Sequence, residues 1–179
     1  IEVLTNFPDM KVIAPHYILS SIQATRLREF LDTFPNLYSD ISYGHDDFIK
    51  AGIKRISNDP EKFRSIFKDY PDRFFFGSDL VLTELDAKSA DWQMKRINTY
   101  FDMLTKNTYT TPVLPDTTFN GLALSGDLLE GILYKNFRKF QDLKPTGTKI
   151  KRSIDWKNMG VSKTGRFPGQ AFPPEPKKK

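Results

Sequence analysis

The stretch RFFFGSD, residues 73–79, places three consecutive phenylalanines directly before a glycine, a serine and an aspartate. An uninterrupted apolar run of this kind is typical of a strand buried on both faces, as in parallel sheets flanked by helices. A carboxylate at the carboxyl end of such a strand contributes little to packing but is well placed for chemistry. The stretch therefore predicts a parallel sheet and makes Asp79 a candidate functional residue.

The residues before this stretch predict two further strands with helices between them. MKVIAPHY (10–17) is a short β-branched run closed by proline and histidine, and PNLYSDIS (35–42) is a second run opened by a Pro-Asn turn. Apolar residues at helical spacing predict a helix over 20–34. A further helix is expected over 60–70, where Pro60 takes the first helical position.

Two of these helices have an expected cap: Ser20 or Ser21 for the first helix, and Asp59 for the helix that begins at Pro60. Beyond the third strand, a polar loop over 107–120 and a final helix over roughly 126–141 are predicted. Between the strand and the loop, one apolar helical stripe is expected from Ala90, Met94, Ile97, Phe101 and Leu104.

Charge is divided unevenly along the 179 residues. Residues 1–143 hold 17 Lys/Arg against 20 Asp/Glu, a net charge of −3, whereas residues 144–179 hold 10 against 2, a net charge of +8. The second part is rich in Pro, Gly and Lys and shows little periodicity, so we expect an extended or disordered basic tail there. With no cysteine in the chain, disulfides, thiol nucleophiles and cysteine zinc sites are excluded.

Strands that alternate with helices predict parallel β-α units. The expected strand ends near residues 16, 42 and 79 lie 26 and 37 residues apart, and an eightfold β/α barrel of about 250 residues uses about 31 per unit. Active-site groups of such barrels sit at the carboxyl ends of the strands. The sequence therefore predicts an α/β fold, about three units of a TIM-type barrel, with His16 and Asp79 at the functional edge.

Four segments carry a family resemblance: FPDMKVIAPHY (7–17), FPNLYSDIS (34–42), YPDRFFFGSDLV (70–81) and LLEGILYKNFRKF (128–140). In this order they resemble strands six, seven and eight and the last barrel helix of the amidohydrolase-related family of metal-dependent hydrolases, which includes nonoxidative decarboxylases. The resemblance covers about residues 6–143 and implies a partial amidohydrolase-type barrel over 1–143, followed by the basic tail.

The resemblance implies roles for two residues. Asp79 matches the family's strand-eight aspartate, which binds the catalytic divalent metal, most often zinc, or accepts a proton from the metal-bound water. His16 matches the strand-six histidine, which orients or deprotonates that water or binds a second metal. The family also uses a His-x-His pair and a strand-five histidine, but this chain has only His16 and His45. Together with the start at Ile1, this leads us to expect a fragment, with the remaining ligands in an N-terminal part.

Structural alternatives remain open for these residues. Asp79 could cap a turn, and His16 could donate to a backbone carbonyl at the strand end. For His45 a loop role is favoured over contact with substrate or metal, and Asp46 and Asp47 are expected to cap a helix.

The sequence gives less specific indications for five other residues. Arg73, Asp40 and Tyr43 could line a pocket, although nothing in the sequence singles them out. Trp92 and Met94 are expected to pack in a helix rather than to form a cofactor site.

The functional expectation is a metal-dependent hydrolase that attacks a C–N, C–O or ester-type bond, or a nonoxidative decarboxylase, acting on a small-molecule substrate and inactive as the fragment alone. We expect no nucleic-acid partner and no membrane span, since no apolar run approaches about 18 residues. A homo-oligomer is possible because a partial barrel exposes strand edges, and localisation leans to the cytoplasm. The rival is a noncatalytic module that binds an acidic partner through the basic tail.

Overall fold

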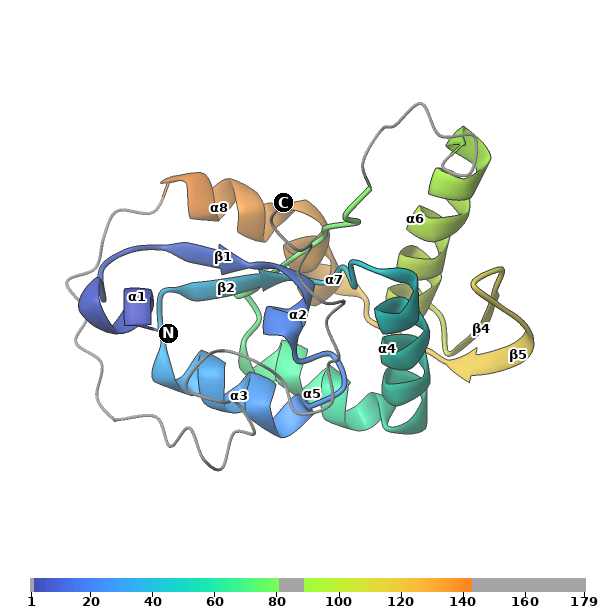
Figure 1. Cartoon of the computed structure of the whole chain (residues 1–179), viewed down its shortest axis with the longest axis horizontal. Helices are drawn as coiled ribbons and strands as arrows, with labels where there is room; N and C mark the ends of the chain where they lie inside the picture. Colours follow the sequence, from blue (N-terminus) through green and yellow to red (C-terminus); the bar gives the residue numbers. More distant parts are fainter. Residues whose placement is uncertain (1, 81–88, 143–179) are drawn as a thin grey trace, which may run out of the picture.

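The structure is a computed structural model that describes residues 2–80 and 89–142 (Figure 1). Its centre is a three-stranded parallel sheet in the order β1 (Val12–Ala14), β2 (Leu37–Asp40) and β3 (Phe74–Phe75). Val12 pairs with Leu37, and Ser39 with Phe74. The predicted α/β class with a parallel sheet is therefore confirmed. The basic tail predicted over 144–179 lies outside the described residues.

Helices fill most of the remaining described chain. They are α1 (Glu2–Asn6), α2 (Pro15–Leu19), α3 (Ala24–Thr33), α4 (Asp46–Asn58), α5 (Pro60–Asp69), α6 (Ala90–Thr105), α7 (Gly126–Glu130), the π-helical turn η2 (Gly131–Lys135) and α8 (Asn136–Asp142). A separate antiparallel hairpin is formed by β4 (Thr108–Thr111) and β5 (Leu114–Asn120).

Helices cover both faces of the parallel sheet (Figure 1). Adjacent strand residues point to opposite faces, and Leu37 packs with α3 while the Tyr38 ring lies 4.8 Å from that of Phe140 in α8. Likewise, Phe74 lies 4.7 Å from a ring of α5, and Phe75 lies 5.4 Å from Phe140. Helices on both faces are typical of doubly wound α/β proteins, whereas strand side chains fill the inner face of a closed barrel.

The last helical segment is anchored to β3 through one irregular turn. The backbone N–H of Phe76 donates to the carbonyl of Ile132 (2.7 Å), a carbonyl within η2. Asn136, which is buried, donates through its side-chain amide to the carbonyls of Pro71 (2.8 Å) and Phe74 (3.0 Å). Asn136 and the carbonyl of Ile132 thus fix η2 and α8 beside the third strand.

Two predictions about the second half of the chain were wrong. Residues 107–120, expected as a loop, contain the β4–β5 hairpin. Of the stripe expected on α6, Leu104 is buried, but Met94 and Phe101 do not face the core, since they are 53% and 45% exposed. The helix buries Leu104 together with Arg96, Thr99, Tyr100 and Met103. This face is selected by polar contacts as well as by apolar ones, because Thr99 bonds to Thr111 of the hairpin at 2.7 Å.

Helix capping follows the prediction at one helix and departs from it at another. Asp59 caps α5 and accepts from the backbone N–H of Lys62 at 3.3 Å, as predicted. The helix expected from residue 20 begins at Ala24 without a side-chain cap. Ser20 and Ser21 are buried ahead of it, because the chain between β1 and α3 makes the turn of α2.

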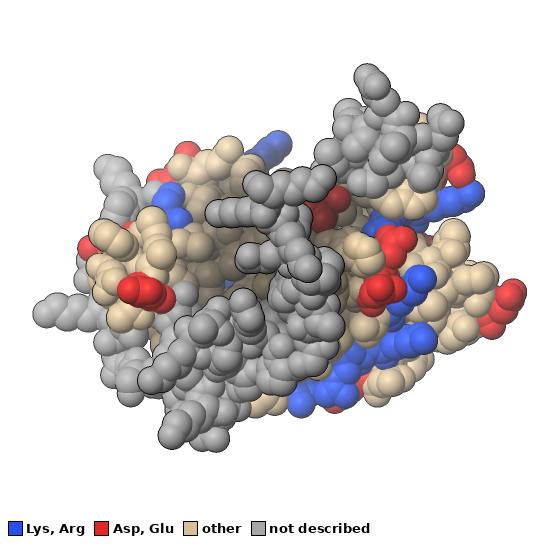
Figure 2. Space-filling view, viewed as in Figure 1, with Lys and Arg blue, Asp and Glu red and all other residues tan. Residues whose placement is uncertain are grey.

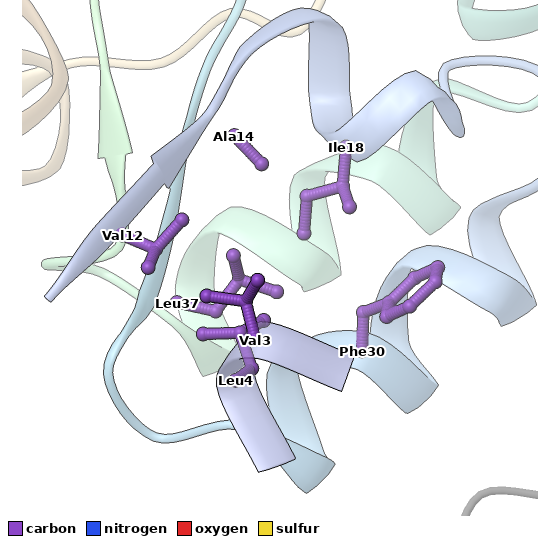
Figure 3. A pocket seen from close by; sticks show the side chains of 7 residues that line it. All are labelled: Val3, Leu4, Val12, Ala14, Ile18, Phe30 and Leu37. Atoms are coloured by element: carbon purple, nitrogen blue, oxygen red, sulfur yellow. The ribbon is translucent and has the colours of Figure 1, made fainter. Parts of the chain in front are cut away.

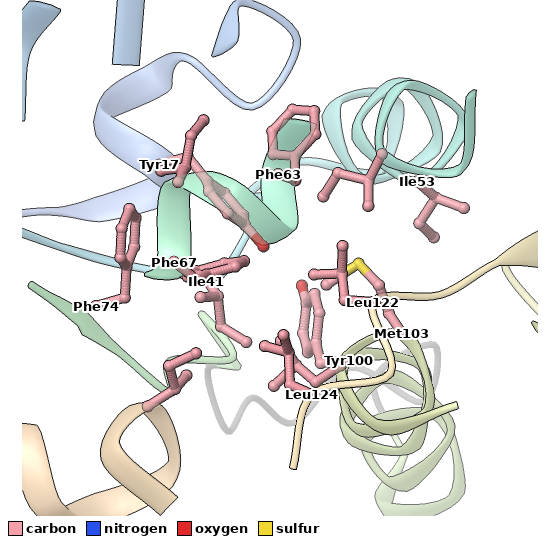
Figure 4. Packing of buried hydrophobic residues seen from close by; sticks show 14 of the residues in the cluster. Tyr17, Ile41, Ile53, Phe63, Phe67, Phe74, Tyr100, Met103, Leu122 and Leu124 are labelled. Atoms are coloured by element: carbon pink, nitrogen blue, oxygen red, sulfur yellow. The ribbon is translucent and has the colours of Figure 1, made fainter. Parts of the chain in front are cut away.

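A single large apolar cluster joins the sheet, α4, α5, α6 and the hairpin (Figure 4). Tyr17, Tyr43 and Tyr100 contribute three of its fully buried rings, with centroids 5.3 Å apart for the first pair and 5.8 Å for the second. Figure 4 shows Tyr17 and Tyr100 with their hydroxyl ends in the middle of the cluster. Tyr17, Ile41 and Tyr43 belong to this cluster and directly follow β1 or β2, so the residues just beyond these strand ends are anchored in the core.

Within residues 2–80 and 89–142, no helix has both the length and the apolar character needed to cross a membrane.

Candidate functional site

The carboxyl ends of the three parallel strands bring together residues that are far apart in the sequence. His16 follows β1, Ser42 follows β2 and Asp79 follows β3. The Nε2 atom of His16 lies 4.0 Å from Oδ2 of Asp79, and the two side chains are 21% and 44% exposed. Both sequence-predicted site residues therefore lie at one solvent-accessible edge.

His16 begins a left-handed turn. Residues His16, Tyr17, Ile18 and Leu19 have φ angles of 61°, 53°, 57° and 52°. Left-handed helical backbone costs an L-residue roughly 1–2 kcal/mol, and non-glycine residues adopt it as single residues rather than in runs. Asp79 also has a positive φ, 50°. Both candidate residues thus sit on strained backbone, a feature that clusters at functional sites.

Buried contacts impose the left-handed turn. The Tyr17 side chain is fully buried in the core. The backbone N–H of His16 donates to Oδ1 of Asp40 (2.8 Å), and that of Ile18 donates to Oγ of Ser39 (3.1 Å). Since both acceptors belong to β2, the second strand holds the residues that follow the first.

Asp40 and Ser42 extend the site beyond the two predicted residues. Oδ1 of Asp40 accepts from the hydroxyl of Ser42 (2.7 Å) and from its backbone N–H (3.0 Å). Oγ of Ser42 lies 2.7 Å from Nδ1 of His16. Asp40 ends β2, two residues before the strand end predicted near residue 42, so the strand-end criterion that selected His16 and Asp79 points to Ser42 and not to Asp40.

Two glycines allow the strand ends to approach this closely. A Cβ atom on Gly77 would lie 2.7 Å from Cβ of Asp40, closer than packed carbon atoms can lie. Gly44 has a φ of +70°, and a Cβ there would lie 3.3 Å from Nε2 of His16. This contact explains the glycine at the end of the apolar run. The backbone at position 77 packs against the side chain of Asp40, so a residue with a Cβ atom would clash there, two residues before Asp79.

The charged side chains of the site act on the hydroxyl of Tyr100 in α6. Burial raises the pKa of its hydroxyl to about 12, opposed by the positive charge of Arg96 and reinforced by the carboxylates of Asp79 and Asp40. Arg96 itself pairs with Asp46 at the start of α4 and stacks over Trp92, 4.7 Å from the ring centroid. Trp92 thus has a packing role, as expected for it.

The remaining histidine lies outside this group. His45 is the N-cap of α4, where its Nδ1 accepts from the backbone N–H of Asp47 at 3.4 Å. Its side chain is 73% exposed. The capping role expected for Asp46 and Asp47 therefore belongs to His45, and the two acids occupy the first turn, where they complement the helix dipole.

Arg73 and Tyr43 have structural roles. The guanidinium of Arg73 donates to the carbonyls of Leu37 and Phe34, and it stacks 5.1 Å from the ring centroid of Tyr38. The hydroxyl of Tyr43 donates to the sulfur of Met103 at 3.2 Å within the core. Of the three residues that could have lined a pocket, only Asp40 contacts the site.

An apolar pocket of about 240 Å³ lies elsewhere, between α1, α3 and the β1–β2 part of the sheet (Figure 3). Its walls include Val3, Val12 and Phe30, and all its lining side chains are aliphatic or aromatic. Ligand sites require a few polar groups that fix orientation, so this pocket is a poor reaction site. The candidate site residues His16 and Asp79 lie instead at the open edge of the sheet.

The described residues contain no cluster of three or more His, Cys, Asp or Glu side chains arranged to hold a metal ion. His16 and Asp79 offer two donor atoms of the types that zinc binds, an imidazole nitrogen and a carboxylate oxygen. Two ligands of a tetrahedral zinc ion, with bonds of about 2.0–2.2 Å, lie about 3.4 Å apart, whereas the two atoms are 4.0 Å apart. The pair therefore has suitable donor types, and its side chains would have to approach by about 0.6 Å to share one ion.

Comparisons of the chain with protein-family models, curated protein sequences and solved structures find no match.

Proposed function

We propose that the chain contributes part of the active site of a metal-dependent hydrolase or nonoxidative decarboxylase acting on a small-molecule substrate. The observation that carries the proposal is the 4.0 Å approach of His16 and Asp79 at the accessible carboxyl edge of a parallel sheet. In both barrels and open α/β sheets, substrates bind at this edge. The proposal therefore needs the parallel sheet and not barrel closure.

His16 and Asp79 would hold a divalent metal, with zinc the best match to their donor types. A metal bound there supplies a water molecule whose pKa is lowered toward about 7. Because the chain has two histidines and no cysteine, a site rich in histidine draws its other ligands from outside this chain. The two residues would be the part of that site built on the last three strands.

In this proposal Asp79 is a ligand and proton acceptor, and Nε2 of His16 has one of two roles: it binds the metal, or it stays uncoordinated and orients or deprotonates the attacking water. Both groups are open to solvent, at 44% and 21% exposed. Ser42 is excluded as the nucleophile, because its side chain is completely buried and its hydroxyl donates to Asp40. Water, rather than a serine, is thus the proposed attacking group.

We further propose that the chain is the C-terminal part of a TIM-type barrel, strands six to eight. The parallel order β1-β2-β3 and the convergence of strand ends support this. The position of α8 against Tyr38 and Phe75 opposes it, because this helix covers the face that barrel closure would use. Closure requires α8 to leave that face, whereas a doubly wound sheet retains it.

The test is the metal content of the protein expressed from its complete natural reading frame, measured by plasma mass spectrometry. We expect about one or two equivalents of zinc, manganese or iron, since metallohydrolases hold one or two ions. Asp79→Asn and His16→Ala should each lower the metal content or affinity. No metal in the wild type after reconstitution with each ion would refute the proposal.

Matched controls are available for both substitutions. Asp116 is also exposed and has a positive φ, 61°, but lies in β5, so Asp116→Asn reproduces the chemical change away from the site. His45→Ala removes the only other histidine. Equal loss of metal from a variant and its control would show a general effect on folding and would contradict the assigned roles.

The rival function is binding of an acidic partner through the basic tail, which lies outside the described residues. Basic groups of the described residues would add to such binding. Figure 2 shows Lys and Arg side chains gathered over the part of the visible face where α4 and α5 lie. These helices carry Lys50, Lys54, Lys62 and Lys68. A protein without metal that binds an acidic peptide, with affinity falling steeply as salt is raised, would favour this function over the hydrolase.

A further inference from the structure

We propose that Asp40 and Ser42 are positioning residues that keep the proton of neutral His16 on Nδ1, so that the lone pair of Nε2 is directed toward Asp79. The inference deepens the proposed function and rests on it, because the tautomer matters catalytically only if Nε2 serves a metal or a water. It is nevertheless measurable in the protein without metal.

The hydroxyl of Ser42 fixes the direction of the hydrogen bonds. An ionised carboxylate can only accept, and a serine hydroxyl has one proton to donate. Oδ1 of Asp40 lies 2.7 Å from Oγ of Ser42, so the serine proton must lie between these two oxygens. If it pointed to His16 instead, two acceptor oxygens would face each other at 2.7 Å without a hydrogen.

The ring of His16 must then act as the donor. Nδ1 lies 2.7 Å from Oγ of Ser42, whose own proton is already donated to Asp40. A close contact between this oxygen and nitrogen requires a proton on Nδ1, and a neutral imidazole with that proton has an unprotonated Nε2. The hydrogen bonds from His16 to Ser42 and from Ser42 to Asp40 therefore leave Nε2 as the acceptor nitrogen of the neutral His16 ring.

A competing arrangement would place the proton on Nε2, facing Asp79. The distances disfavour it, because Nε2 and Oδ2 of Asp79 are 4.0 Å apart, beyond hydrogen-bond range, whereas Nδ1 is at 2.7 Å. Burial acts in the same direction: Ser42 is 0% exposed, so water does not compete for its oxygen. Outer partners of this type commonly fix the tautomer of metal-binding histidines.

The other histidine provides an internal reference of opposite type. Nδ1 of His45 accepts from the backbone N–H of Asp47 at 3.4 Å, so neutral His45 carries its proton on Nε2. The chain has no third histidine. One spectrum of the chain should therefore contain two imidazoles in opposite tautomers.

The experiment is long-range ¹H–¹⁵N correlation spectroscopy on ¹⁵N-labelled chain 1–179 without metal, at a pH where both rings are neutral. We expect His16 with its proton on Nδ1 and His45 with its proton on Nε2; His45→Gln assigns the signals. Ser42→Ala should shift the His16 population toward Nε2–H. Ser57→Ala, which removes another buried serine that accepts a backbone N–H at 2.8 Å, should leave it unchanged.

The wild-type spectrum decides the inference even if Ser42→Ala fails to fold. His16 protonated on Nε2 in the wild type, or a His16 population unaffected by Ser42→Ala in a folded protein, would overturn it. The metal assay is separate: absence of metal with His16 protonated on Nδ1 refutes the proposed function but leaves the positioning intact. If metal binds, Ser42→Ala should weaken its affinity by about 10–100-fold.

Discussion

Replacing Asp40 should destabilise the fold more than its partial exposure suggests. Its Oδ1 atom accepts from the N–H of His16, the N–H of Ser42 and the hydroxyl of Ser42, at 2.8, 3.0 and 2.7 Å. Hydrogen bonds to a charged group contribute about 1.5–3 kcal/mol each, and neutral ones about 1 kcal/mol. Asp40→Asn keeps the acceptor but loses its charge, so we expect a loss of about 2 kcal/mol after solvent screening.

Asp40→Ala removes the acceptor altogether. The backbone N–H groups of His16 and Ser42 then lose their acceptor, and each unpaired donor costs about 1–3 kcal/mol, whereas the hydroxyl of Ser42 can still donate to Nδ1 of His16. We therefore expect a loss of about 4 kcal/mol, and the order alanine, asparagine, wild type in increasing stability. Urea unfolding followed by circular dichroism, with linear extrapolation, measures these differences.

The exposed Asp116 serves as the matched control, and Asp116→Asn should change stability by less than about 0.5 kcal/mol. If both Asp40 variants unfolded at the same urea concentration as this control, with unchanged slopes, the carboxylate could not be what holds the residues after β1. The explanation of the left-handed turn given above would then be wrong.

Three further predictions follow from single features of the structure. Gly77→Ala places a Cβ 2.7 Å from that of Asp40, so urea unfolding should show a loss of about 1–3 kcal/mol. Leu19→Gly relieves a positive φ of 52° at a residue that is 54% exposed. The relief of about 1–2 kcal/mol, less the entropy cost of a glycine of about 0.5–1 kcal/mol, should raise the free energy of unfolding by about 0.5–1 kcal/mol. An unchanged or lower free energy of unfolding would contradict the claim that Leu19 is strained. Alkaline pH should unfold the protein, because burial raises the folded-state pKa of four tyrosines, that of Tyr100 to about 12. Their contribution is complete below the unfolded value near pH 10 and is lost as pH rises through the folded values, so tyrosinate absorbance at 295 nm should rise together with unfolding.

The sheet and its functional edge could be predicted from sequence because the signals are local and repeated. Each strand is an apolar run that ends at a polar residue, and this pattern placed His16 and Asp79 at one edge, where the structure has them 4.0 Å apart. For the second strand the pattern predicts an end near Ser42, and the structure ends β2 at Asp40. The roles assigned to these residues and the amidohydrolase resemblance remain predictions, since no comparison tests them.

The errors arose where tertiary contacts override local pattern. The polar, proline-containing sequence of residues 107–120 predicts a loop, yet an edge strand tolerates proline, and alternating Tyr109 and Thr111 bury one face of β4. On α6, the apolar spacing of Met94 and Phe101 suggested a core stripe, but the helix rotates to bury Arg96 against Asp46. Partners distant in sequence decided both outcomes.

The left-handed turn could not have been predicted, because nothing in the sequence His-Tyr-Ile-Leu favours it. Four such residues cost together about 4–8 kcal/mol, a large part of the 5–15 kcal/mol that stabilises a typical domain. The cost is shared by the four residues from His16 to Leu19, and of these His16 faces Asp79. The buried Tyr17 ring and the acceptors of β2 hold the turn, so the strain has a structural cause. The turn also maintains the contact of the His16 ring with Ser42 at 2.7 Å, which is the contact that the proposed tautomer requires.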